Sequence, residues 1–213
     1  GMNHQGEGVG KYQGFTVFVP FVLPGDRIVA EIGEVKRSYA RGKALQVLSR
    51  SPDFVPGNCS IYGKCGGCCL QHFDYSEQLR YKQKVVENAL QRIGKLQGIK
   101  VLPVIGMEYP FCYRNKAEYP VRLVDGRFAS GFFASKSSHL VPLEETCPVQ
   151  HPLLEKARKA FIGICNGPDF RKKFAETGFH QLVVRAGVNT REVMVIAAVD
   201  APVPGTEGFF ERL

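Results

Sequence analysis

The first fifty residues alternate between short apolar runs and glycine- or proline-rich turns. Residues 15–19 (FTVFV) form a β-rich run, and residues 27–32 alternate so that one face of a strand is apolar. Between them, residues 23–26 (LPGD) place proline and glycine where a type II turn requires them. Residues 44–48 form another short strand after a basic loop at residues 36–43. Several short strands separated by glycine- and proline-rich turns predict a small β-barrel.

The clearest helical pattern covers residues 76–93. Asp74 or Ser76 can cap its amino terminus, and Gly94 ends it. Its apolar residues recur at three- and four-residue spacing, which predicts one buried stripe along the helix. These residues are Leu79, Val86, Leu90 and Ile93.

The rest of the chain mixes strand and helix patterns. Residues 115–124 and 127–133, joined by an Asp-Gly turn, predict a β-hairpin. Residues 152–165 predict a second helix, and residues 179–186 and 191–199 predict a final pair of strands. The pattern therefore predicts an α+β protein, with a small barrel followed by a mixed α/β domain.

The composition is that of an ordinary globular protein, with 44% hydrophobic and 23% charged residues. The longest apolar run, residues 193–199, is far shorter than the roughly 20 residues that span a bilayer, so no membrane role is expected. Seven cysteines make an odd number, and no secretory signal peptide is recognisable. We therefore expect a reducing, cytoplasmic setting.

The net charge of +8 favours a polyanionic partner. Residues 36–43 carry four basic residues and no acidic one, and residues 80–122 carry nine basic residues against three acidic ones. A single basic run is an ordinary solvated surface about as often as it is a binding site for nucleic acid. Here Tyr39, Tyr113 and Tyr119 accompany the basic residues, and aromatic rings stack with unpaired bases. The combination predicts RNA binding.

A cysteine pattern gives the strongest chemical signal. Cys59, Cys65 and Cys68 lie within ten residues, with two glycines between the last pair, and Cys147 is followed by a proline. Four thiolates of this kind hold an iron–sulfur cluster or a structural zinc ion. The Cys-Pro ending is similar to bacterial ferredoxin loops, which favours a [4Fe–4S] cluster, with zinc as the alternative. We interpret Cys69, Cys112 and Cys165 as ordinary apolar residues.

Three stretches together resemble the RumA/TrmA family of RNA (uracil-5-)-methyltransferases. Residues 6–26 and the basic segment after them look like a TRAM domain, an OB-like RNA-binding barrel. The cysteine loop, followed by Leu-Gln-His at residues 70–72, looks like the family's cluster loop, and residues 113–116 (YRNK) resemble a short family motif. The resemblance is closest to the members that carry an iron–sulfur cluster and methylate 23S rRNA.

The resemblance implies a TRAM domain at residues 1–52 and a central iron–sulfur, RNA-recognition domain at residues 53–213. It implies that Cys59, Cys65, Cys68 and Cys147 hold the [4Fe–4S] cluster. It also implies a flipped uridine, a thiolate that adds to C6 of its ring, and methyl transfer to C5 from S-adenosylmethionine. The basic residues expected to contact RNA are Lys36, Arg37, Arg41, Lys43, Arg114 and Lys116.

The sequence has no glycine-rich S-adenosylmethionine loop and no recognisable catalytic residue. Gly8-Val9-Gly10 lacks the third glycine of a nucleotide fingerprint. The Gly-Met opening and the ending at Leu213 also favour a piece of a larger enzyme, one that uses S-adenosylmethionine only when complete. The chain is expected to be monomeric. We therefore expect this chain alone to be inactive. The alternative is a non-catalytic zinc-ribbon and OB-fold RNA-binding module, since a ferredoxin-like electron carrier does not fit the basic charge.

Overall fold

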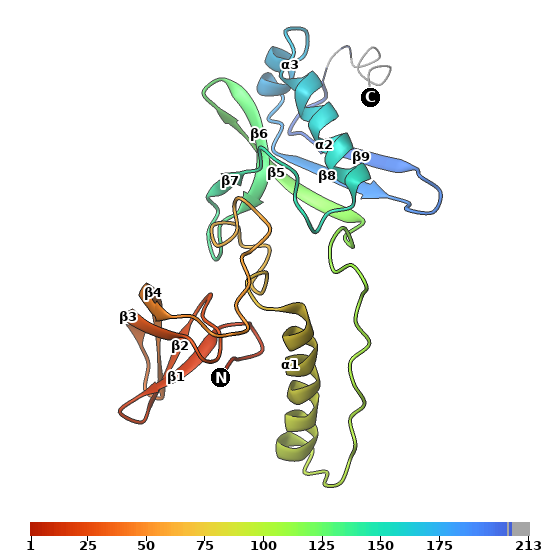
Figure 1. Ribbon diagram of the computed structural model, residues 1–213. Helices are drawn as coiled ribbons and strands as arrows, with labels where there is room; N and C mark the ends of the chain where they lie inside the picture. The colour runs from red at the N-terminus through yellow and green to blue at the C-terminus, as the bar shows by residue number, and fades with distance from the viewer. Residues whose placement is uncertain (204, 206–213) are drawn as a thin grey trace. The chain divides into compact units, whose positions relative to one another are not determined.

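A computed structural model describes residues 1–203 and 205, and the chain divides into two compact units (Figure 1). The first unit comprises Gly1–Asn58 and Cys68–Glu108, and the second comprises Cys59–Gly67 and Tyr109–Leu213. In the described part of the chain, no helix has the length and apolar character needed to cross a membrane.

The first unit contains a four-stranded sheet in the order β1-β2-β4-β3. Its strands are β1 (Gly8–Tyr12), β2 (Phe15–Val19), β3 (Arg27–Val35) and β4 (Tyr39–Ser49). β2 and β4 are parallel, while the β1–β2 and β3–β4 pairs are antiparallel. The edge strands β1 and β3 are not neighbours in this sheet, and residues from β1, β2 and β3 line an apolar cavity of about 730 Å³. The closed OB-like barrel therefore stays a prediction.

β4 corrects one expectation from the sequence. The basic segment was expected to be a loop, but from Tyr39 onward it lies in a central strand that pairs with both β2 and β3. Ala40 is buried in this strand, and a Cβ at Gly42 would lie 2.5 Å from the Glu31 carbonyl oxygen. Pairing on both edges therefore outweighs the polar character of the segment, as long as small residues alternate with the basic ones.

A helix completes the first unit, with α1 (Tyr75–Asn88) continuing into the π-helical turn η1 (Ala89–Ile93). The Asp74 carboxylate caps α1 by accepting hydrogen bonds from the backbone N–H groups of Ser76 and Glu77. Tyr81 donates its hydroxyl hydrogen to the Met2 carbonyl oxygen at 2.7 Å, which ties the helix to the start of the chain. The predicted helix is confirmed, but none of its residues is fully buried.

The second unit contains an antiparallel five-stranded sheet in the order β7-β6-β5-β8-β9. The predicted hairpin is confirmed as β5 (Lys116–Val124) and β6 (Arg127–Phe133), and the final strand pair as β8 (Gln181–Ala186) and β9 (Val193–Ala198). A short strand, β7 (Leu140–Pro142), was not predicted.

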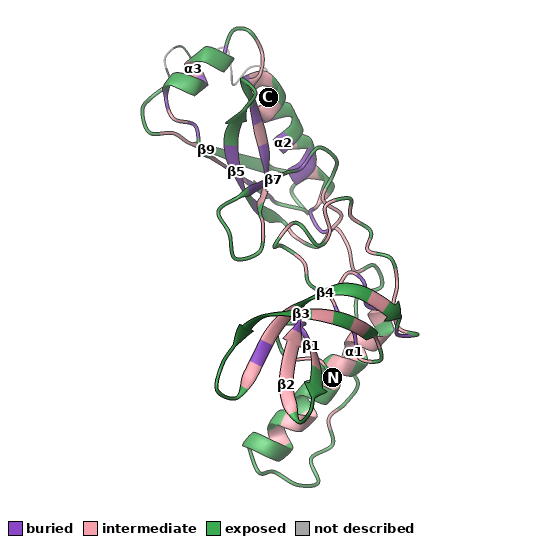
Figure 2. Ribbon diagram, turned by 90° about the vertical axis from the view of Figure 1, so that its left-hand side faces the viewer, coloured by how far each residue is buried: buried purple, intermediate pink, exposed green. Residues whose placement is uncertain are grey.

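Helices cover one face of this sheet and enclose the main core. The predicted helix is confirmed as α2 (Pro152–Cys165), which packs against β8, β6 and β9, and the short α3 (Arg171–Glu176) follows it. Figure 2 shows buried residues on both α2 and β5. Tyr119, Leu154 and Leu182 are completely buried between these layers. The α+β class is confirmed. The predicted domain boundary after residue 52 stays a prediction, and the last predicted domain residue, Leu213, lies outside the described residues.

Candidate functional site

The cysteine loop begins with a tight turn in the second unit. The Ile61 carbonyl oxygen accepts hydrogen bonds from the backbone N–H groups of Lys64 (3.1 Å) and Cys65 (3.0 Å), and Tyr62 donates to the Cys59 carbonyl oxygen. These bonds fold the five residues between Cys59 and Cys65 back on themselves. The first two predicted ligands therefore belong to one compact turn.

The end of β6 fixes the next part of the loop. Cys65 forms a β-bridge with Ala134, and Gly66 donates its N–H to the Phe133 carbonyl oxygen at 2.9 Å. A Cβ at Gly66 would lie 3.0 Å from the Ser135 Cα atom, so a side chain here would require the neighbouring backbone to shift slightly. Gly67 then donates its N–H to the Cys65 Sγ atom at 3.3 Å. An amide pointing at a cysteine sulfur stabilises the thiolate form, which is the form that binds metals.

Cys147 lies in a loop of the same unit, and that loop is held by backbone pairing. Cys112 donates its N–H to the Pro148 carbonyl oxygen at 2.9 Å, and Arg114 donates to the Val149 carbonyl oxygen at 3.0 Å. The Cys147 side chain is half-buried and packs against the main core. Two segments about thirty-five residues apart are thus joined beside the predicted fourth ligand.

All seven cysteines are free thiols, and the four predicted ligands are half-buried. Within the described residues, no group of three or more Cys, His, Asp or Glu side chains has the arrangement that holds a single metal ion. Around one zinc ion the sulfurs must all lie about 2.3 Å from the metal. In a four-iron cluster each thiolate binds a different iron, so the sulfurs stand farther apart. The donor types fit a cluster, and their convergence on one stays a prediction.

Cys68 and Cys69 are adjacent and have different surroundings. A Cβ at Gly6 would lie 3.1 Å from the Cys69 Sγ atom, so this thiol lies against the start of the chain in the first unit. Desolvation, followed by the charge of Cys68, raises the pKa of the Cys69 thiol. A raised pKa disfavours the thiolate form of Cys69. Of the two adjacent cysteines, Cys68 is therefore the better candidate for the ligand.

The other cysteines have structural surroundings. Cys165 is completely buried at the end of α2, and burial raises its pKa to about 12. The Cys112 thiol lies 3.7 Å from the Pro148 carbonyl oxygen. Neither arrangement would activate a nucleophile.

Most of the predicted RNA-binding residues form ion pairs. Lys36 Nζ lies 2.8 Å from Glu34, Lys43 Nζ lies 2.7 Å from Glu31, and Lys116 Nζ lies 2.7 Å from Glu118. These pairs are exposed, and such pairs contribute little to stability, so a phosphate can replace the carboxylate partner. The hydrogen bond from Lys36 to Glu34 raises the pKa of Lys36 and keeps it charged.

Arg41 and Arg114 have structural contacts in addition to their charge. Arg41 forms an ion pair with the buried Glu7, and its guanidinium lies 5.6 Å from the centre of the Phe18 ring. Arg114 donates from Nη2 to the Gly67 carbonyl oxygen at 3.3 Å, which brings it to the cysteine loop. In the described chain no carboxylate lies within ion-pair distance of Arg37, so its charge is the one in this set available without breaking a contact.

The acidic partners were missed at the sequence level. Glu31 and Glu34 lie on β3, directly opposite Lys43 and Arg41 on β4. The signal was present in the sequence, because both acids occur in the strand that precedes the basic segment. For Lys43, recognising the pair required knowing that the basic segment is itself a strand, whereas Glu34 and Glu118 lie only two residues from Lys36 and Lys116 in the sequence.

Residues 1–45 match the TRAM domain. An uncharacterized RNA methyltransferase of Halalkalibacterium halodurans is 39% identical over 92% of this chain and 43% of its own length. One from Thermosynechococcus vestitus is 38% identical over 99% of this chain and 48% of its own length.

Among solved structures, the Pyrococcus abyssi tRNA (uracil-54, C5)-methyltransferase in complex with S-adenosyl-L-homocysteine matches with a TM-score of 0.62 and 27% identity. The match covers 98% of this chain and 50% of that one. This chain thus spans about half the length of the proteins it matches. Residues 1–45 thus match a TRAM domain, and the chain is similar in sequence to RNA methyltransferases and in structure to a tRNA uracil-5 methyltransferase.

Proposed function

We propose that this chain is the RNA-recognition and iron–sulfur part of an S-adenosylmethionine-dependent methyltransferase that forms 5-methyluridine in 23S rRNA. The observation that carries the proposal is similarity over almost the entire chain to RNA methyltransferases and to a structure of a tRNA uracil-5 methyltransferase. The choice of rRNA over tRNA comes from the cysteine loop, which resembles that of the rRNA enzymes.

The methyl donor would act outside this chain. The solved neighbour is bound to S-adenosyl-L-homocysteine, the product that S-adenosylmethionine leaves after methyl transfer, which supports the use of this donor. The present sequence has no glycine-rich donor loop and spans about half of its relatives. This chain alone is therefore expected to bind RNA and to methylate nothing. The predicted cytoplasmic setting and monomeric state belong to the same proposal.

Four cysteines would hold the cluster in this proposal: Cys59, Cys65, Cys68 and Cys147. The support is local: a folded turn at Cys59–Cys65, an amide directed at the Cys65 sulfur, and a Cys147 loop fixed by backbone pairing. A bound [4Fe–4S] cluster would supply thiolate–iron bonds that link segments far apart in the sequence. Arg114, which contacts this loop, would connect the cluster region to the RNA surface.

RNA contacts would lie at the β3–β4 end of the TRAM domain in the first unit and, separately, at the start of β5 in the second unit. Lys36, Arg37 and Lys43 are exposed in the TRAM domain, with Arg41 held among aromatic rings. Such cations hold phosphates, while aromatic and guanidinium faces stack with bases. Arg114 and Lys116 would lie nearer the target nucleotide.

Neutralising Lys36, Arg37 and Lys43 together with glutamine tests this surface. Each lost phosphate contact should reduce the slope of log affinity against log salt by about 0.7 on single-stranded RNA. Binding would be measured by fluorescence anisotropy across a salt series. Arg41 is left intact because its ion pair with Glu7 is part of the fold.

The matched control neutralises Lys156, Lys159 and Lys172, three exposed lysines of α2 and α3. It removes the same total charge, so an effect of net charge alone would appear in both variants. If the slope is unchanged in the first variant, or falls equally in both variants, the TRAM surface is not the RNA-binding surface.

A further inference from the structure

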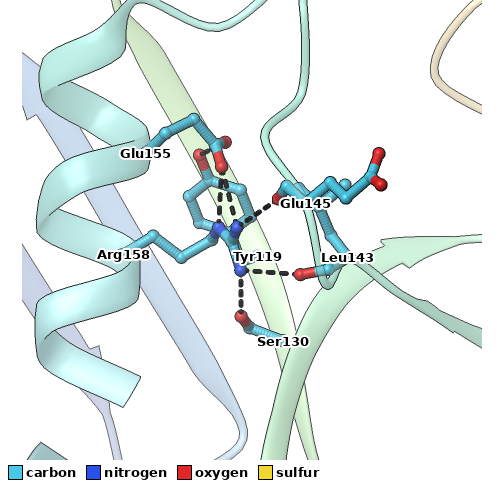
Figure 3. Close-up of polar contacts among 6 residues, drawn as sticks. All are labelled: Tyr119, Ser130, Leu143, Glu145, Glu155 and Arg158. Carbon is cyan, nitrogen blue, oxygen red and sulfur yellow. Dashed lines mark hydrogen bonds and ion pairs between the residues drawn. The ribbon is translucent and has the colours of Figure 1, made fainter. Parts of the chain in front are cut away.

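A buried polar network of side chains on α2 and β5 lies in the second unit, and none of its side chains belongs to a cysteine or to the basic segment of β4. Glu155 and Arg158, one turn apart on α2, are 2% and 3% exposed, and Tyr119 on β5 is completely buried. Figure 3 shows the three side chains directed at one another and at the loop after β7. Nothing in the proposed RNA recognition uses this network.

Arg158 uses every hydrogen-bond donor that it has. Its Nε and Nη2 atoms donate to Glu155 Oε2 at 3.0 and 2.8 Å, and its Nη1 atom donates to Ser130 Oγ at 3.2 Å. The remaining bonds go to backbone carbonyl oxygens, from Nη1 to Leu143 at 2.9 Å and from Nη2 to Glu145 at 2.8 Å. A planar guanidinium with five N–H groups fits this arrangement, and a lysine ammonium does not.

Two side chains fix the orientation of the guanidinium. The Tyr119 hydroxyl donates to Glu155 Oε1 at 2.9 Å, so both carboxylate oxygens are occupied. The Arg158 guanidinium also lies 5.6 Å from the centre of the Tyr119 ring. Burial, followed by the Glu155 charge, raises the pKa of Tyr119, so its hydroxyl keeps the donated proton. The contacts with Glu155 and Tyr119 therefore fix the Arg158 guanidinium in the orientation in which it binds the loop.

The loop that Arg158 binds leads directly to Cys147. Glu145 precedes this cysteine by two residues, and Pro148 and Val149 after it are held by Cys112 and Arg114. Cys147 thus lies between a side-chain clamp and a backbone clamp. We propose that Arg158 is a positioning residue, which holds the 143–147 loop so that Cys147 is presented to the iron–sulfur cluster. This inference rests on the cluster assignment proposed above.

The attraction between the two buried charges does not by itself account for such a network. A buried ion pair can often be exchanged for apolar residues without loss of stability, because desolvation offsets the attraction between the charges. An apolar pair would nonetheless leave the Leu143 and Glu145 carbonyl oxygens without their donor. Arg158 thus contributes what an apolar residue could not: hydrogen bonds that fix the backbone of the 143–147 loop.

The test replaces both charges, as Glu155→Met with Arg158→Met, since removing Arg158 alone would leave a buried carboxylate without its partner. The protein is reconstituted anaerobically with iron and sulfide, and loss of the cluster absorbance is followed after adding a chelator. Residues behind metal ligands typically change metal affinity by 10- to 100-fold. We expect the variant to lose its cluster at least about tenfold faster than the unmodified chain, with an unchanged circular dichroism spectrum.

Asn166→Ala is the matched control. Asn166 also ties α2 to β6, by exchanging two hydrogen bonds with the Phe128 backbone, and among the described residues its side chain makes no hydrogen bond to the 143–147 loop. It should destabilise the unit and leave cluster loss unchanged. The positioning role would be overturned if the control and the double variant lost the cluster at the same rate. It would also be overturned if the double variant lost the cluster no faster than the unmodified chain.

Two further measurements separate this inference from the proposal beneath it. If the unmodified chain takes up no iron and sulfide, the cluster assignment itself fails, and the positioning role fails with it. If it takes up both, the alkylation rate of Cys147 in the metal-free protein reports the loop directly. That rate should rise in the double variant and in Arg158→Lys, while the rate at Cys59 stays the same. An unchanged Cys147 rate would overturn the inference alone.

Discussion

Alanine in place of Leu182 is expected to lower the free energy of unfolding by about 2–5 kcal/mol. Leu182 lies on β8, an interior strand of the five-stranded sheet, opposite Tyr119 on β5 and Ala197 on β9, and its side chain is completely buried. Removing it deletes buried methyl groups and leaves a cavity that neighbouring strands cannot easily fill. Denaturant unfolding followed by circular dichroism measures the change.

Met194→Ala is the control for this prediction. Met194 lies on the neighbouring strand β9 and is 48% exposed, so its truncation should change the free energy of unfolding by no more than about 0.5 kcal/mol. Similar losses at both positions would mean that the sheet is not packed as described.

Serine in place of Cys65 is expected to abolish cluster binding. Cys65 is held to β6 by a bridge to Ala134 and receives the Gly67 N–H at its sulfur, so no other side chain can take over its position. Serine keeps the size of the side chain and removes the soft thiolate that iron requires. Iron and acid-labile sulfide, measured per chain after anaerobic reconstitution, should fall to background.

Cys69→Ser provides the matched comparison, because Cys69 is one residue from a predicted ligand and lies against Gly6. It should retain iron and sulfide at the level of the unmodified chain. Loss in Cys69→Ser with retention in Cys68→Ser would reverse the ligand assignment. Zinc without sulfide in the unmodified chain would instead favour the zinc-ribbon alternative.

Regular periodicity made the second unit the more predictable one. The 152–165 helix has a proline at its first position and an apolar stripe, and the structure places α2 over the same residues. The 115–133 hairpin was equally clear, because an Asp-Gly turn joins two alternating runs. Local sequence determined both elements.

Long-range pairing accounts for the features that the sequence did not reveal. Tyr39–Lys43 has the composition of a loop, and it becomes a strand because β2 and β3 pair with its two edges. In the sequence, Glu155 and Arg158 are three residues apart on the predicted helix, a spacing that is common for exposed ion pairs. Only the fold buries them and brings the Leu143 and Glu145 carbonyl oxygens to the guanidinium.

The sequence predicts the residue types of the candidate site but not the contacts that hold them. Cysteine spacing identified the loop, and the structure adds the anchors at β6 and beside Cys147. Net charge pointed to RNA, but it concealed the carboxylate partners of Lys36 and Lys43. Composition counts charges, whereas binding depends on which of them are already paired.

Methyl transfer tests the central proposal most directly. A longer protein containing this chain would be incubated with methyl-labelled S-adenosylmethionine and either unmodified 23S rRNA or unmodified tRNA, and the RNA would then be digested to nucleosides. We predict label in 5-methyluridine from 23S rRNA, and no label when this chain is used alone. Label in another nucleoside, or in no RNA at all, would contradict the proposed function, and 5-methyluridine in tRNA alone would contradict the choice of rRNA.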